Sequence, residues 1–118
     1  MVIGSRFAVS ERALGRGLLL AVVEGEIDMA TREELTVRLL AAARAAERGL
    51  VVDLSAVEFM GAAGIHALEG ARTELARRGG ALAVVAPGGT PFRILDVTKL
   101  TETFNVAPSL DAALRKFS

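Results

Sequence analysis

The 118-residue sequence contains no cysteine, tryptophan or tyrosine, and its only histidine is His66. Without cysteine there is no disulfide, thiolate nucleophile or zinc–thiolate site, and one histidine cannot build a multi-histidine metal centre in a single chain. The five phenylalanines are the only aromatic residues, so the stacking platforms typical of proteins that bind single-stranded nucleic acid or sugars are missing. These absences exclude most redox and metal chemistry and favour a binding module.

The sequence also lacks a charge of one sign and a long apolar run. Fourteen basic residues balance fourteen acidic ones, so no overall positive field attracts nucleic acid or anionic lipid, and we predict no direct nucleic-acid partner. The apolar runs at residues 17–23 and 81–92 are ended or interrupted by Glu, Pro and Gly, so neither can span a bilayer. The N-terminus has no signal-peptide apolar region. We predict a cytoplasmic protein without membrane insertion.

Hydrophobic residues make up 52% of the chain, which is enough for one core, and no repeat or linker divides it, so we predict a single domain over residues 1–118. Apolar and β-branched runs predict strands at residues 7–14, 18–23, 50–54, 81–86 and 103–106. Helical spacing predicts helices from a Thr31–Glu34 capping box to a stop at Gly49, and at residues 65–78, 91–98 and 110–117. This order predicts an α/β fold: a mixed, mainly parallel sheet of about five strands, with an N-terminal hairpin and about four helices packed on it.

Two strand-to-helix junctions carry motifs: Gly-Glu-Ile-Asp at residues 25–28, and Val-Asp-Leu-Ser-Ala-Val-Glu-Phe-Met-Gly-Ala-Ala-Gly-Ile at residues 52–65. These motifs, their spacing and the helix order resemble STAS domains, especially bacterial anti-sigma-factor antagonists, over essentially the whole chain. The resemblance implies a module that binds an anti-sigma factor, often a GHKL-type serine kinase as well, and thereby frees a sigma subunit for RNA polymerase. Whether the chain forms a homodimer is left open by the sequence.

The second motif departs from the family pattern where that family is phosphorylated. The second helix of these antagonists usually begins Asp-Ser-Ser-Gly or Asp-Ser-Thr-Gly, with phosphate on the second hydroxyl residue. Here the four positions are Gly61, Ala62, Ala63 and Gly64, so Ala63 stands at the acceptor position. A methyl group cannot receive the phosphate, whose charge of about −2 would disrupt an apolar interface. We predict binding without control at this position, or a partner that is not a kinase.

The two junctions are predicted to form one partner-binding surface, as implied by the resemblance. Its expected residues are Glu26, Asp28, Thr31, Met60, Gly61, Ala62, Ala63, Gly64 and His66. Ala63 is expected to present an exposed methyl, Phe59 to be buried, and Met60 to be the adaptable contact. For Asp28 the alternative is hydrogen bonding to the backbone amides that open the first helix.

No residue pattern predicts catalysis. Asp53 lacks a catalytic companion and is expected to bind a loop amide, while Ser55 lacks a nucleophile elbow. His66 lies off the apolar stripe of its helix and is expected to face solvent. We therefore predict no enzyme, no metal site and no cofactor. Two other roles stay open: a regulatory or docking STAS subunit of a membrane transporter or stress-signalling complex, and a domain that binds a small ligand or nucleotide.

Overall fold

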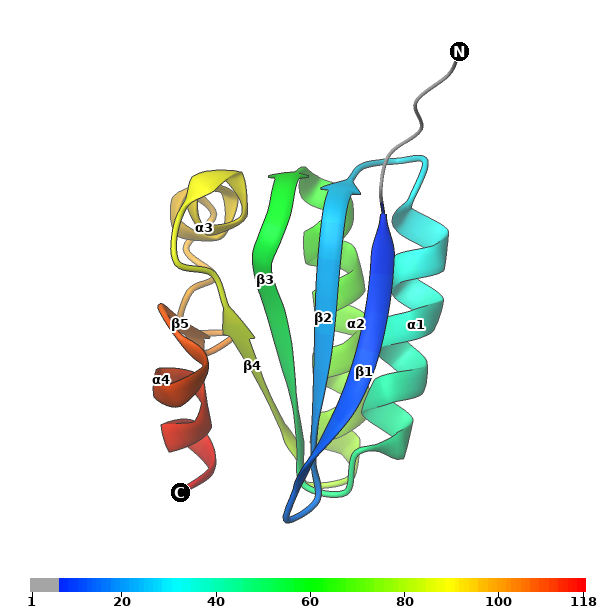
Figure 1. Ribbon diagram of the computed structural model, residues 1–118, viewed down its shortest axis with the longest axis vertical. Helices are drawn as coiled ribbons and strands as arrows, with labels where there is room; N and C mark the ends of the chain where they lie inside the picture. The colour runs from blue at the N-terminus through cyan, green and yellow to red at the C-terminus, as the bar shows by residue number, and fades with distance from the viewer. Residues whose placement is uncertain (1–6) are drawn as a thin grey trace.

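The computed structural model describes residues 7–118, in which strands and helices alternate after an N-terminal hairpin (Figure 1). The elements are β1 (Ala8–Gly15), β2 (Leu18–Ile27), α1 (Arg32–Ala45), β3 (Gly49–Met60), α2 (Ala62–Arg77), β4 (Ala81–Val85), α3 (Gly89–Val97), β5 (Val106–Ala107) and α4 (Leu110–Leu114), followed by a 3₁₀ turn at Arg115–Phe117. Ser109 caps α4 as predicted, because its hydroxyl accepts the Ala112 amide at 3.1 Å.

The described strands form one sheet in the order β1-β2-β3-β4-β5. β1 pairs antiparallel with β2 and the other pairs are parallel, which confirms the predicted mixed sheet with an N-terminal hairpin. The hairpin turn needs its glycines, because Gly15, Arg16 and Gly17 all have positive φ. The ends of β2, β3 and β4 meet at one side, which we call the carboxyl edge. The other side, where α1 and α2 end and β3 and β4 begin, is the amino edge.

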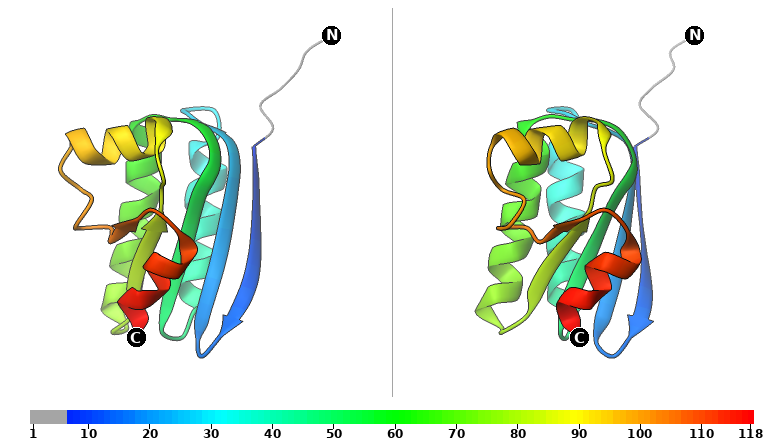
Figure 2. Two further views of the ribbon diagram at one scale, coloured as in Figure 1. Left: turned by 60° about the vertical axis from the view of Figure 1, so that its left-hand side comes forward. Right: turned by 90° about the vertical axis from the view of Figure 1, so that its left-hand side faces the viewer.

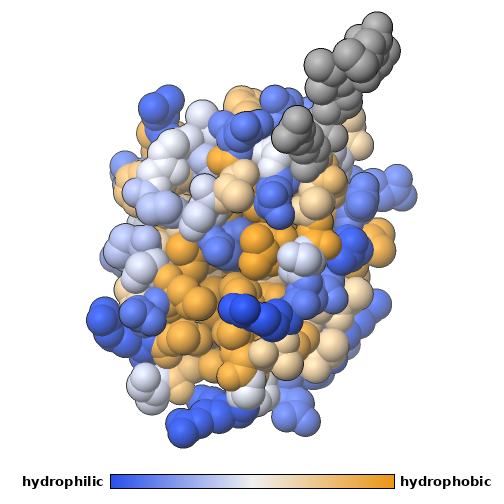
Figure 3. All heavy atoms as spheres, in the orientation of Figure 1, coloured by the Kyte–Doolittle hydropathy of each residue, from blue (hydrophilic) through white to orange (hydrophobic). Residues whose placement is uncertain are grey.

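The sheet lies between two unequal layers of helix. α1 and α2 pack side by side on one face, and α4 lies on the other (Figure 2). The larger core lies under α1 and α2, where Leu39, Leu50, Leu68 and Phe104 are buried. The smaller core on the opposite face has α4 as its cover. α4 is short, so apolar atoms remain visible across the middle of this face (Figure 3).

Several predicted boundaries are wrong, for local reasons. β3 continues beyond Leu54 to Met60, because irregular pairing with β2 accommodates the polar residues in between. α1 ends at Ala45, and Gly49 instead begins β3. The strand expected at residues 103–106 lies at Val106–Ala107. No described helix is long and apolar enough to cross a membrane.

Candidate partner-binding surface

The β2–α1 loop is held by two polar side chains that satisfy its backbone. The Asp28 carboxylate accepts the amides of Ala30 and Thr31 at 2.9 and 3.0 Å. The Thr31 hydroxyl donates to the Glu26 carbonyl at 2.9 Å and accepts the Asp28 amide at 3.0 Å. Asp28 therefore has the predicted alternative role of binding amides before α1. The predicted Thr31–Glu34 capping box is wrong, because the Thr31 hydroxyl bonds back to the loop and makes no side-chain cap.

The β3–α2 junction is joined directly to this loop and to α3. The Gly61 amide donates to the Ile27 carbonyl at 3.0 Å, which brings the two sequence motifs together at the carboxyl edge. The Met60 amide donates to the Thr90 hydroxyl at 2.9 Å, which ties the junction to the first turn of α3. Gly64 is required by packing, since a Cβ there would lie 2.6 Å from the Met60 side chain. The junction is thus a fixed platform.

The expectations for Phe59 and Met60 are reversed. Met60 is 2% exposed and lies in the main core, whereas Phe59 is 45% exposed. The cause is the irregular pairing at the end of β3, where a register shift lies between Gly25 and Glu26 of β2. Burial consequently recurs every third residue, at Leu54, Val57 and Met60, instead of every second. Met60 cannot contact a partner without leaving the core.

The expectation of an exposed methyl at Ala63 is also wrong. Ala63 is 8% exposed and packs in the main core, and Gly64 beside it is buried. Ala62 is the exposed methyl at the start of α2. Thr31 is 9% exposed as well, and its hydroxyl is used within the loop. A partner approaching this edge therefore meets Ala62 and Phe59 before it meets Ala63, Met60 or Thr31.

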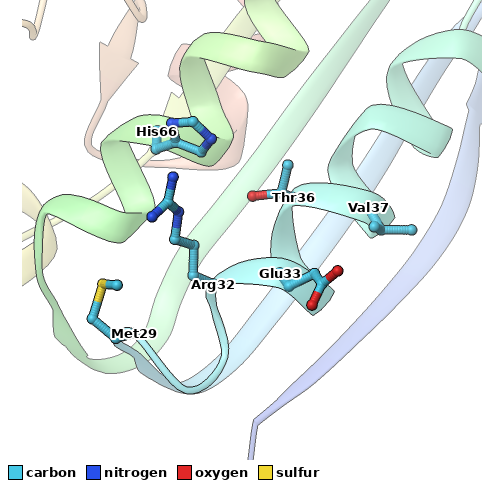
Figure 4. A pocket seen from close by; sticks show the side chains of 6 residues that line it. All are labelled: Met29, Arg32, Glu33, Thr36, Val37 and His66. Atoms are coloured by element: carbon cyan, nitrogen blue, oxygen red, sulfur yellow. The ribbon is translucent and has the colours of Figure 1, made fainter.

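A groove opens between the first two turns of α1 and those of α2. It has a volume of about 480 Å³ and is lined by Met29, Arg32, Glu33, Thr36, Val37 and His66 (Figure 4). The Arg32 side chain points toward His66 across the groove, and His66 is exposed, as predicted. Met29 is 74% exposed and Val37 is 58% exposed. The Thr36 hydroxyl oxygen is buried and has no hydrogen-bond partner among the described residues.

Asp53 and Ser55 lie on β3, and their contacts are local. The Asp53 carboxylate accepts the Ser55 amide at 2.9 Å and the Ser55 hydroxyl at 2.5 Å. Asp53 thus binds a backbone amide as predicted, but this amide lies within β3 and not in a loop. Within residues 7–118, no three His, Asp or Glu side chains are grouped to hold a metal ion. The Arg72 hydrogen bond lowers the pKa of Glu69, which lies one turn after His66 on α2.

The structure brings Glu26, Asp28, Gly61, Ala62 and His66 to the same edge of the sheet. Sequence reasoning missed six residues that line or border this surface: Met29, Arg32, Glu33, Thr36, Val37 and Phe59. A signal was available for Met29 and Val37, since the first lies in the loop between two elements and the second lies off the apolar stripe of α1. None was available for Phe59, whose exposure depends on the irregular strand pairing.

The family model of the STAS domain matches residues 15–113, which include both junctions. This chain belongs to the STAS domain family. A comparison of the STAS domain with curated proteins finds no match. Among solved structures, an anti-sigma factor antagonist from Mycobacterium paratuberculosis is 34% identical, with a TM-score of 0.80, over 96% of this chain and 93% of that one.

Two more distant solved structures share the fold. The anti-sigma factor antagonist SpoIIAA in its unphosphorylated form is 19% identical, with a TM-score of 0.75, over 93% of this chain and 96% of that one. A sulfate transporter family protein from Wolinella succinogenes is 18% identical, with a TM-score of 0.70, over 89% of this chain and 88% of that one. The same STAS fold thus occurs in anti-sigma factor antagonists and in a sulfate transporter family protein. The fold alone therefore does not determine the role of this chain.

Proposed function

We propose that this STAS domain is an anti-sigma-factor antagonist, a non-enzymatic cytoplasmic module that binds an anti-sigma factor and releases a sigma factor. The likeness to the antagonist from Mycobacterium paratuberculosis supports this role, because it extends over nearly the full length of both chains at 34% identity. The sulfate transporter relative shares only the fold at 18% identity, and the alternative docking role therefore ranks second.

The structural observation that supports this role is the direct contact between the β2–α1 loop and the β3–α2 junction at the carboxyl edge. The Gly61–Ile27 backbone hydrogen bond fixes the β3–α2 junction against the β2–α1 loop, and Asp28 and Thr31 hold that loop with their side chains. Binding by a preformed surface avoids the entropy cost of ordering loops on association. The proposed contact residues are the accessible ones on this edge, Glu26, Met29, Phe59, Ala62 and His66.

We further propose that the binding is constitutive. Ala63 has no hydroxyl, so a serine kinase cannot attach a phosphate at this position. Ser55 and Thr31 are not proposed as alternative phosphate acceptors, since each hydroxyl is engaged in the hydrogen bonds described above.

The test is a calorimetric titration of the STAS domain with each purified anti-sigma factor of its source organism. One factor is expected to bind, and prior incubation of the mixture with ATP should leave both its Kd and the intact mass of the STAS domain unchanged. A loss of binding with a mass increase of one phosphate would contradict constitutive binding. Binding to none of the factors, together with copurification of a membrane transporter, would favour the docking role.

A further inference from the structure

Three exposed apolar side chains gather around the carboxyl edge. Met29 lies in the β2–α1 loop, Val37 on the second turn of α1 and Phe59 at the end of β3, with exposed fractions of 74, 58 and 45%. Met29 and Val37 line the groove between α1 and α2 (Figure 4), and Phe59 lies within van der Waals distance of a Cβ built on Gly61. Exposed apolar groups grouped around a groove are typical of a docking surface.

The charges around these apolar groups are predominantly negative. Residues 24–38 and 56–66 contain six carboxylates and two guanidinium groups, those of Arg32 and Arg38. The carboxylates belong to Glu24, Glu26, Asp28, Glu33, Glu34 and Glu58. Within residues 7–118, none of the six takes part in an ion pair. Neighbouring α3 and the turn after it add Arg93, Asp96 and Lys99 and so do not neutralise the cluster.

The amino edge has the opposite charge. Seven basic residues lie at the ends of α1 and α2, in the hairpin turn and in the final turn, against the two acids Glu47 and Glu74. They are Arg16, Arg44, Arg48, Arg77, Arg78, Arg115 and Lys116. Glu74 is the acid in ion pairs with three of them. The balanced net charge of the chain therefore conceals a separation of charge along the sheet from one edge to the other.

From this charge separation and the apolar groove we infer that the carboxyl edge binds a protein segment that carries apolar side chains flanked by Arg or Lys. The apolar side chains enter the groove beside Met29 and Val37, and the flanking cations face the carboxylates that make no ion pair among residues 7–118. Such complementarity raises the association rate and selects the orientation of approach. The inference deepens the proposed function, on which it rests for the identity of the natural partner.

The probe is a synthetic amphipathic helix of about 18 residues with a leucine stripe flanked by lysines, compared with the same helix flanked by glutamates. In NMR titrations of the full chain, the lysine peptide should shift amide signals in residues 26–37 and 58–66. Its Kd should rise at least about fivefold between 50 and 200 mM NaCl, because screening weakens attraction between exposed charges. Shifts confined to the amino edge, or equal binding of the glutamate peptide at the groove, would overturn the inference.

Paired charge reversals test whether the acidic side chains of the carboxyl edge attract the lysine peptide. Glu33→Lys with Glu34→Lys should weaken binding of the lysine peptide at least about fivefold, whereas Glu47→Lys with Asp111→Lys, which changes the net charge equally, should alter it less than twofold. If the first variant fails to fold, Glu26→Gln with Glu58→Gln on strand residues is compared with Glu47→Gln and Asp111→Asn, which change the net charge by the same amount. Equal effects of the two pairs would overturn the inference.

Failure of this inference and failure of the proposed function are distinguishable. If an anti-sigma factor binds but its affinity is insensitive to salt and to the carboxyl-edge reversals, the charge argument is wrong and the proposed function stands. If the lysine peptide binds in the groove and no anti-sigma factor binds, the surface is assigned correctly and the proposed partner is wrong.

Discussion

The two edges of the sheet use the same kinds of charged residue in different ways. At the amino edge, Arg78 donates to the carbonyls of Ala43 and Ala46 at the end of α1, and Arg48 donates to the Phe117 carbonyl. At the carboxyl edge the loops are held by backbone and small polar groups, and the long acidic side chains point to solvent without ion pairs among the described residues. Charged side chains therefore stabilise the fold at one edge and are available to a partner at the other.

The largest expected effect is a difference in the free energy of unfolding between variants of Met60 and of its neighbour Phe59, at the end of β3. Met60→Ala should lower the free energy of unfolding by about 2–4 kcal/mol, because Met60 is buried in the core. Phe59→Ala should cost less than about 1 kcal/mol of stability and weaken partner binding about tenfold, since Phe59 is exposed. Urea unfolding and calorimetric binding check the pair, with Met60→Leu as the volume-conserving control. Equal destabilisation by both alanine variants would contradict the assigned packing.

A smaller effect is expected at the amino edge. Arg78→Ala should lower the free energy of unfolding by about 2 kcal/mol, because it removes charged hydrogen bonds to two carbonyls at the end of α1. Its neighbour is the control: Arg77 makes a single surface ion pair with Glu74 and its side chain is 71% exposed, so Arg77→Ala should cost less than about 0.5 kcal/mol. A larger loss of thermal stability in Arg77→Ala than in Arg78→Ala would contradict the role assigned to Arg78 at this edge.

At the carboxyl edge, Thr31→Val should lower the free energy of unfolding by about 1–2 kcal/mol. The substitution leaves the Glu26 carbonyl and the Asp28 amide without their hydroxyl partner in a buried position. Thr73→Val is the control, because the Thr73 hydroxyl is exposed and has one long hydrogen bond, 3.3 Å, to Glu69. Chemical denaturation measures both. Indistinguishable losses would show that the Thr31 hydroxyl does not hold the loop.

The smallest effect concerns Glu69, whose pKa is lowered from its ordinary value of 4.5, chiefly by the Arg72 hydrogen bond. A lowered pKa in the folded state adds stability above pH 4.5 that is lost as the pH falls through the lowered value. Because the pair is exposed, Glu69→Gln should cost only about 0.3 kcal/mol at pH 7, and nothing once Glu69 is protonated. Urea unfolding at pH 7 and at a pH where Glu69 is protonated measures this loss of stability, with Glu102→Gln as the control. A difference that persists in acid would contradict the mechanism.

The fold could be predicted from the sequence because its signals are local. Apolar runs and helical spacing place every element in the right order, and Ser109 caps the last helix as expected. The strand-to-helix junctions could be assigned to one edge, because the ends of parallel strands meet there. The length of β3 could not be predicted, since its last residues are held by pairing with β2 and not by their own pattern.

The surface was harder to predict than the fold. Which of Phe59 and Met60 is buried depends on register shifts that sequence alternation does not reveal. The burial of Ala63 likewise follows from packing of α2 on the sheet. The charge separation was hidden by the balanced composition, because it appears only when α1, α2 and the strands are placed side by side.

The most direct test of the central claim is the affinity of the anti-sigma factor for two variants of α2. Ala62 and Ala76 are both exposed, the first at the carboxyl edge and the second at the end of the helix near the amino edge. A lysine at the first position would place a cation on a surface that binds cationic side chains, so Ala62→Lys should raise Kd at least about tenfold and Ala76→Lys should leave it within twofold. Unchanged affinity in Ala62→Lys, with the fold intact, would contradict the account.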